Sequence, residues 1–171
     1  KSTMETITCD VGVVGGGPAG LSACINGASE RLKMVLFDTA PELGGQARKS
    51  SLIENYPGFP RGITGDQLIL NFIAQAEKFS TTINCPFGIG NVRRDGSRIM
   101  MVTEFGQEYA CRAVILTNGL SYLQLYAKNL PRFLGRGAYN GVPSVESERY
   151  TKKTVCIVGG AAGIALSFAV G

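Results

Sequence analysis

The sequence predicts an α/β fold in which a central parallel sheet is flanked by helices, on both of its faces, and by a small antiparallel sheet. Two observations indicate this fold. Apolar runs at residues 11–14 and 34–37 enclose a helical segment, which is the strand–helix–strand pattern of a parallel pair. Short strands joined by tight turns then follow between residues 81 and 117. A parallel unit combined with a β-meander is typical of a three-layer α/β domain.

The first apolar run ends in a glycine-rich loop, Gly15-x-Gly17-x-x-Gly20. In a dinucleotide-binding turn the first glycine permits the tight turn, the second lets the backbone approach a pyrophosphate, and the third lets the helix pack on the strand. Pro18 suits the first helical turn, where its missing N–H is not required. Asp38 ends the second apolar run, where a carboxylate accepts hydrogen bonds from an adenosine ribose. The pattern predicts a dinucleotide site, and a purely structural turn is the alternative.

The segment at residues 40–65 is rich in proline and glycine and is too long for an ordinary connection. Loops of this length in compact domains are usually functional. A helix is predicted after it, because Thr64 can cap it with Gln67 three positions later and apolar residues recur at helical spacing over 68–79. We expect that apolar stripe to face the core and to carry no chemistry.

Residues 81–117 are predicted to form the β-meander. Turn signals at 94–96 and 105–107 divide this segment, which ends in the apolar run 113–116, expected to be a buried strand. A loop rich in leucine, proline and glycine then leads to a further buried strand at 154–158.

A second glycine-rich turn begins at Gly159, but its spacing is broken. Counted from Gly159, the second and third glycine positions fall on Ala161 and Ile164. Side chains there would crowd a pyrophosphate and loosen the fit of helix to strand. The spacing therefore argues against a second complete dinucleotide site.

The chain is predicted to divide after residue 119. Residues 1–119 are expected to form a dinucleotide-binding domain, and 120–171 the connection to a second, incomplete domain together with its first strand. The final segment, 162–171, is apolar on all sides, which suits a buried helix. That helix belongs either to the second domain or, returning, to the first.

Composition limits the classes of protein. With 171 residues, 44% hydrophobic and 18% charged, the chain is globular. The net charge of +4 could favour an anionic ligand or an acidic partner, but ordinary surface lysines are the simpler account. No basic run supports nucleic-acid binding. The longest apolar stretch, 161–171, falls short of the roughly 20 residues that span a bilayer, so we expect a cytoplasmic protein that does not enter membranes.

Histidine and cysteine usage excludes several reaction classes. The sequence has no histidine, which rules out Ser–His and Cys–His nucleophiles and histidine-ligated metal sites. It has no C-x-x-C, and no metal site is predicted. We interpret the widely spaced cysteines as reduced core residues; they are Cys9, Cys24, Cys85, Cys111 and Cys156.

Further motifs carry a family resemblance. They are Leu-Gly-Gly-Gln at 43–46, Glu-Asn-Tyr-Pro-Gly-Phe-Pro at 54–60, Gly-Ile-Thr-Gly at 62–65, Val-Ile-Leu-Thr-Asn-Gly at 114–119 and Phe-Leu-Gly-Arg-Gly at 133–137. In this order they closely resemble segments of the low-molecular-weight thioredoxin reductases, from about Asp10 to Gly160. Those reductases are class II pyridine nucleotide-disulphide oxidoreductases, with Rossmann-like FAD- and NAD(P)-binding domains.

The resemblance implies a flavoprotein with FAD on the first domain, NAD(P)H on a second domain inserted into it, and a homodimer. The residues carried over to FAD are Gly15, Gly17, Pro18, Ala19 and Gly20 at the diphosphate, Asp38 at the ribose, Gly44, Gly45 and Gln46 beside the flavin, Asn55 near it, and Thr117, Asn118 and Gly119 closing over the cofactor. Asn55 has an alternative role as a turn-forming residue before Tyr56.

Two departures from the family bear on the reaction. The family has Cys-Ala-Thr-Cys-Asp after Phe-x-Gly-Arg-Gly, whereas residues 141–145 read Gly-Val-Pro-Ser-Val. Because both sulfurs and the carboxylate are missing there, no dithiol relay from flavin to thioredoxin is expected at that place. Cys156 lies in a predicted buried strand and has no partner at C-x-x-C spacing. The family's C-terminal Gly-Asp motif, which binds the ribityl chain, is also missing.

The function expected from these features is an FAD-dependent NAD(P)H oxidoreductase that passes electrons to an acceptor other than thioredoxin, such as ferredoxin, oxygen or a diffusible oxidant. No side chain is assigned a catalytic role, because the flavin would carry the chemistry. Two alternatives stay open: a flavin- or nucleotide-binding regulatory module without turnover, and an inactive fragment with empty pockets.

Overall fold

The computed structural model describes residues 5–121, 125–139, 150 and 152–158. The chain divides into two compact units, Lys1–Gly119 and Leu120–Gly171, and each is described by itself. Within the described ranges no helix is both long enough and apolar enough to cross a membrane.

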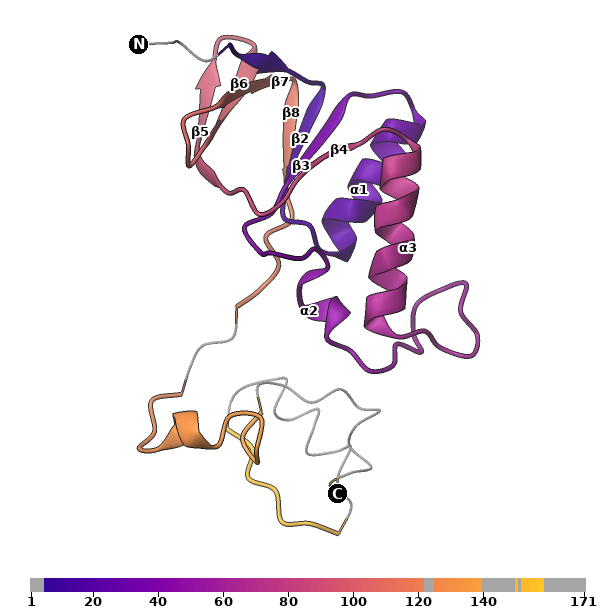
Figure 1. Ribbon diagram of the computed structural model, residues 1–171, viewed down its shortest axis with the longest axis vertical. Helices are drawn as coiled ribbons and strands as arrows, with labels where there is room; N and C mark the ends of the chain where they lie inside the picture. Colours follow the sequence, from indigo (N-terminus) through magenta and orange to yellow (C-terminus); the bar gives the residue numbers. More distant parts are fainter. Residues whose placement is uncertain (1–4, 122–124, 140–149, 151, 159–171) are drawn as a thin grey trace. The chain divides into compact units, whose positions relative to one another are not determined.

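A four-stranded parallel sheet forms the centre of the first unit (Figure 1). Its order is β4 (Thr82–Asn84), β3 (Met34–Phe37), β2 (Val11–Val14) and β8 (Ala113–Leu116). Strand β3 is buried along its whole length because it lies inside the sheet with both faces covered. Its side chains alternate between two cores, with Met34 and Leu36 in one and Val35 and Phe37 in the other.

Helices α1 (Pro18–Ser29) and α3 (Gly65–Lys78) pack on each other on one side of this sheet (Figure 1). Helix α3 begins as predicted, since the Thr64 Oγ1 accepts a hydrogen bond from the Gln67 N–H at 3.2 Å. The two helices and the sheet enclose the larger core, whose buried members are Val13, Leu21, Cys24, Ala28, Met34, Leu36, Leu43, Leu68, Ile69, Phe72 and Ala76.

A second, mixed sheet covers the opposite face of the parallel sheet. Its order is β1 (Ile7–Thr8), β7 (Glu108–Cys111), β6 (Arg98–Thr103) and β5 (Ile89–Asp95). Strands β5, β6 and β7 form an antiparallel meander, and β1 joins β7 in parallel. The three-layer α/β class is confirmed, but the expectation of helices on both faces is wrong, because the meander covers one face of the parallel sheet.

The predicted meander also extended too far at both ends. Strand β4 pairs with β3, and β8 pairs with β2, so both belong to the parallel sheet. Only Arg112 separates β7 from β8, and its N–H donates to the Asp10 carbonyl, as does that of Ala113. The chain therefore crosses from one sheet to the other within a single residue, which strand propensity does not reveal.

Strand β8 is less buried than the sequence predicted. The side chain of Leu116 is 67% exposed and that of Ile115 is 38% exposed. The reason is its position, because β8 is one of the two edge strands of the parallel sheet.

The long loop 40–65 contains local structure. Helix α2 (Gly45–Arg48) forms one turn inside it, and Ile53 and Ile63 form an antiparallel bridge that closes its second half. In the second unit the described residues include a 3-10 helix, η1 (Leu130–Arg132), and a bridge between Leu134 and Ala138.

The strand predicted at residues 154–158 is not formed, and Cys156, expected to be buried in it, is exposed. A strand needs a neighbour to pair its N–H and C=O groups, and this segment has none among the described residues. The glycine-rich turn at Gly159, the segment 162–171 and all of residues 140–149 lie outside the described residues.

Candidate dinucleotide-binding site

The glycine-rich loop connects β2 to α1, and two of its three glycines are required by the fold itself. Gly15 has φ 109°, and a Cβ there would overlap the Thr117 carbonyl. A Cβ on Gly20 would overlap the Gly15 carbonyl and lie 2.8 Å from the Thr117 Oγ1. Both glycines therefore allow the strand, the helix and the start of residues 117–119 to approach closely.

Gly17 differs from its two neighbours in the motif. It is the N-cap of α1 with φ −75° and ψ −175°, a backbone conformation open to any residue. No atom of the described chain lies within 4 Å of the position that a Cβ on Gly17 would take. The fold does not require glycine here, so the open space beside Gly17 is available to a ligand that contacts the backbone.

The amino end of α1 faces this open space without a side-chain cap. Pro18 occupies the first helical position, and Ala19 and Gly20 follow it. The first N–H groups of a helix have no intrahelical acceptor, and together with the helix dipole they favour a phosphate group.

Asp38 joins the glycine loop to the long loop. Its Oδ2 accepts a hydrogen bond from the Gly16 N–H at 2.6 Å, and its Oδ1 accepts one from the Ala40 N–H at 2.8 Å. A carboxylate has about four lone-pair directions, so each oxygen keeps capacity for a ligand hydroxyl. The structure therefore brings Asp38 beside the glycine loop, and it adds a structural role that the sequence did not predict.

Residues 43–46 pack against the same loop. The Gly44 N–H donates to the Gly16 carbonyl at 2.8 Å, and a Cβ on Gly45 would lie 3.8 Å from the Gly17 Cα. Gly44 and Gly45 have φ 117° and 54°, which explains the glycine pair. Gln46 is exposed at the first turn of α2.

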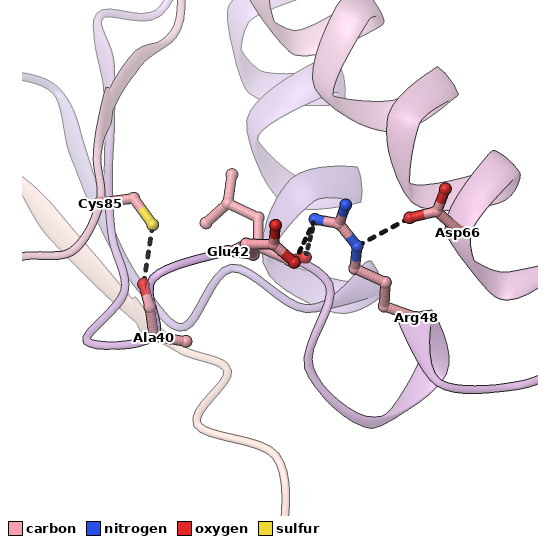
Figure 2. A network of polar contacts seen from close by, with 6 residues as sticks. Ala40, Glu42, Arg48, Asp66 and Cys85 are labelled. Atoms are coloured by element: carbon pink, nitrogen blue, oxygen red, sulfur yellow. Dashed lines mark hydrogen bonds and ion pairs between the residues drawn. The ribbon is translucent and has the colours of Figure 1, made fainter.

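Arg48 holds this segment in place (Figure 2). Its Nε donates to the Asp66 Oδ1 on α3 at 2.9 Å, and its Nη1 donates to the Leu43 carbonyl at 3.2 Å. The Glu42 Oε2 lies 3.6 Å from the same Nη1. Sequence reasoning missed this residue, because its partners are scattered over the loop and the next helix and no short motif marks them.

Thr117 closes the site from the end of β8. Its Oγ1 donates to the carbonyls of Val14 and Gly15, at 3.0 and 2.8 Å. A Cβ on Gly15 would also lie 3.1 Å from the Asn118 nitrogen, and Gly119 has φ 67°. The predicted segment Thr117–Gly119 thus begins against the glycine loop.

Asn55 takes a different place from the other predicted residues. It is exposed and lines a shallow hollow of about 320 Å³ with its neighbours in the segment Glu54–Pro60. Tyr56 anchors this segment by its ring, which packs edge-on against Phe72 with centroids 5.6 Å apart. The contacts that hold the glycine loop do not include Asn55.

The glycine loop, Asp38 and Thr117 follow the carboxyl ends of β2, β3 and β8 and meet at that edge of the sheet. In open α/β sheets ligands bind at that edge, where the chain connections leave the sheet in different directions. In the described part of the chain, no group of three or more carboxylates, cysteines or histidines is placed to hold a metal ion.

Fold and loop together define a Rossmann-like α/β protein of the FAD/NAD(P)-binding class. The family model described as pyridine nucleotide-disulphide oxidoreductase matches residues 9–170, and the chain belongs to this family.

The curated relatives include thioredoxin reductases and ferredoxin–NADP reductases. The chain is 34% identical over 148 residues to thioredoxin reductase of Vibrio cholerae, covering 86% of this chain and 45% of that protein. It is 34% identical over 157 residues to ferredoxin–NADP reductase of Salinispora arenicola, covering 88% of this chain and 47% of that protein. The chain thus spans about half the length of these relatives.

Among solved structures, thioredoxin reductase from T. acidophilum aligns with a TM-score of 0.70 and 25% identity, over 95% of this chain and 52% of that one. The predicted resemblance to thioredoxin reductases and the predicted fold class are confirmed.

Proposed function

We propose that the first unit binds FAD with its diphosphate against the backbone of Gly17, Pro18, Ala19 and Gly20. The observation that carries this proposal is the open space at Gly17. Gly15 and Gly20 are explained by close backbone packing alone, whereas glycine at position 17 has no structural reason within the described chain. A diphosphate lying against the helix amino end supplies that reason.

The remaining contacts are those that the family resemblance implies, and the positions of Asp38, Gly44 and Thr117 beside the glycine loop support them. Asp38 would accept a hydrogen bond from the adenosine ribose while keeping its bonds to the Gly16 and Ala40 N–H groups. Gly44, Gly45 and Gln46 would lie beside the flavin. Thr117, Asn118 and Gly119 would close over the cofactor, and Asn55 would contact its edge, unless it serves only to form the turn before Tyr56.

We propose that the protein is an NAD(P)H oxidoreductase that resembles thioredoxin reductase and delivers electrons to an acceptor other than thioredoxin. A bound flavin supplies two-electron transfer, and the chain binds and orients it. The acceptor proposal rests on the sequence at 141–145, Gly-Val-Pro-Ser-Val, which contains no thiol. A cytoplasmic location and a homodimer are part of the same proposal, by analogy with the family.

The experiment is a visible spectrum of the purified chain, with FAD supplied, followed by anaerobic addition of NADPH. Flavin absorption bands that bleach on adding NADPH are expected. Bands that persist would contradict turnover and favour a nucleotide-binding module, an alternative motivated by the broken spacing of Gly159, Ala161 and Ile164. A protein that is colourless after FAD has been supplied and the unbound FAD removed by gel filtration would refute the cofactor assignment.

A second assay tests the acceptor. We expect no NADPH-dependent reduction of thioredoxin, or of a small aromatic disulfide, even in the presence of FAD, because exchange needs a thiolate that meets the disulfide sulfur directly. Turnover that is lost when Cys156 or Cys111 is alkylated would overturn this expectation by revealing a redox centre elsewhere in the chain.

A further inference from the structure

Two cysteines from distant parts of the sequence meet in the smaller core of the first unit. The Sγ atoms of Cys9 and Cys111 lie 2.9 Å apart, although 102 positions separate the residues. Both are buried, with 4% and 0% of their surfaces exposed. No other pair of sulfurs in the described residues makes such a contact.

The backbone register explains why the sulfurs meet. Strands β1 and β7 are parallel, with Ile7 opposite Tyr109 and Thr8 opposite Ala110. The Cys9 N–H continues this ladder by donating to the Ala110 carbonyl at 3.1 Å. Neighbouring strands lie about 4.8 Å apart, which falls inside the range of Cα separations that a disulfide can bridge.

The surroundings leave space for this pair and little else. Met101, Phe37, Val35 and Tyr109 enclose it in the smaller core. On the parallel sheet Gly12 faces the sulfurs, and a Cβ there would overlap the Met101 side chain and lie 3.1 Å from the Cys111 Sγ. Glycine at this point of β2 therefore makes room for the sulfur-bearing side chains.

We propose that Cys9 and Cys111 form a redox-active dithiol, which hydrogen peroxide oxidises to a disulfide linking the residue that follows β1 to the end of β7. The Cys9 sulfur attacks one peroxide oxygen, the O–O bond breaks, and water and a sulfenic acid are formed. The Cys111 sulfur then attacks the Cys9 sulfur, its proton leaves with the sulfenic oxygen as a second water, and the S–S bond forms. The two thiols lose two electrons, and the peroxide gains them.

The electrostatics assign the order of attack. The hydrogen bond from the Cys111 thiol, aided by the positive charge of Lys33, holds the pKa of Cys9 below its usual value. Its neighbour Cys9 and burial raise the pKa of Cys111. Cys9 is therefore the better nucleophile of the pair.

Access and geometry both allow the reaction. Strand β1 is two residues long, and its Ile7 is 38% exposed, so local opening at this edge admits a molecule as small as peroxide. A disulfide bond measures about 2.05 Å, so the sulfurs must approach by roughly 0.9 Å.

This pair is separate from the proposed cofactor site. Cys9 precedes β2 and the glycine loop follows it, so the four residues of β2 lie between them, a span of roughly 13 Å. The proposal therefore does not depend on flavin binding.

The test is peptide mapping of the native protein after treatment with hydrogen peroxide, followed by denaturation and alkylation of the remaining thiols. The expected product is a Cys9 peptide linked to a Cys111 peptide and lighter than the sum of the two by two hydrogens. Cleavage before Asp10 is needed, because Cys9 and Cys24 have no lysine or arginine between them and would share a tryptic peptide. Dithiothreitol should reverse the link.

Matched variants make the result decisive. Cys24→Ser removes a buried thiol of the other core and should leave the link unchanged, whereas Cys111→Ser should abolish it. Recovery of both Cys9 and Cys111 as alkylated thiols, under conditions that oxidise the exposed Cys156, would overturn the proposal. So would oxidation of Cys9 to a sulfinic acid without a link. Both overturning outcomes are measured on the wild-type chain, so the test remains decisive even if one variant fails to fold.

Discussion

Gly17 and Gly20 give opposite predictions although they belong to one loop. A Cβ on Gly17 would meet no atom of the described chain within 4 Å, and its backbone conformation suits any residue. Gly17→Leu should have two opposing effects on stability. Leucine restricts the unfolded chain, which stabilises the folded state, but it is a poorer N-cap than glycine, so the free energy of unfolding should change by no more than about 1 kcal/mol. In Gly20→Ala the new methyl would overlap the Gly15 carbonyl, and such overpacking costs about 1–3 kcal/mol or more.

FAD binding should show the opposite order: Gly17→Leu, the more stable variant, should bind FAD more weakly than Gly20→Ala. The leucine in Gly17→Leu would occupy the space proposed for the FAD diphosphate. Losing that contact should raise the Kd for FAD at least about 100-fold, which corresponds to about 2.8 kcal/mol. Gly20→Ala keeps its backbone N–H and leaves the space beside Gly17 open, so it should weaken FAD binding less than Gly17→Leu does, mainly through the fraction of the chain that it leaves unfolded.

Urea unfolding followed by circular dichroism, together with titration of FAD by the quenching of its fluorescence, measures both quantities. Gly90→Leu is the matched control, because Gly90 lies in β5 outside the glycine loop and a Cβ there makes only ordinary contacts at 3.9 Å. If Gly17→Leu were as destabilised as Gly20→Ala, the loop would be a structural turn. If it bound FAD like the wild type, the diphosphate would not lie at Gly17.

Three further predictions follow from the polar contacts. Asp38→Ala removes the acceptor of the Gly16 N–H, so the free energy of unfolding in urea should fall by about 1–3 kcal/mol and FAD binding should weaken; unchanged values would remove both roles of Asp38. Arg48→Gln should weaken FAD binding about threefold to tenfold and lower the free energy of unfolding by less than about 1 kcal/mol. Because Arg48 donates to Asp66, adding Asp66→Asn to this variant should change both values little further; losses that add would show that the two residues are not coupled. The Lys33 N–H, followed by Arg112, holds the pKa of Asp10 below its usual value, so the folded state loses stability as pH falls below about 4. Asp10→Asn should therefore flatten the acid limb of unfolding midpoints measured from about pH 5 to about pH 2.5, and an unchanged slope would contradict the assignment.

Local signals in the sequence predicted the parts of the site that depend on local geometry. The spacing of Gly15, Gly17 and Gly20 identifies the strand-to-helix turn because all three lie in one short segment, although the carbonyl that excludes a Cβ at Gly15 belongs to the distant Thr117 and no atom of the described chain excludes one at Gly17. The turns at 94–96 and 105–107 were predicted for the same reason, and Gly96 and Gly106 there have φ 57° and 85°. Thr64 caps α3 as its spacing to Gln67 predicts.

Features that depend on distant pairing were missed or predicted wrongly. Propensity assigns β4 and β8 as strands but cannot say that they pair with β3 and β2 instead of with the meander. The exposure of Leu116 follows from an edge position, which only the strand order reveals. Arg48 and the pair of Cys9 and Cys111 depend on contacts between elements, and no spacing in the sequence marks them.

The pairing of β2 with β8 also sets the order in which the nucleotide site can form during synthesis. Val11 lies opposite Ala113, so β2 can pair with β8 only after about a hundred further residues have been synthesised. Contacts of such long sequence separation slow folding, because a long loop must close before they form. Until Thr117 has emerged from the ribosome, its hydroxyl cannot donate hydrogen bonds to the carbonyls of Val14 and Gly15. The Thr117 backbone, against which Gly15 packs, is also not yet available. A ribosome-bound chain should therefore acquire affinity for FAD only after residues 113–119 have emerged.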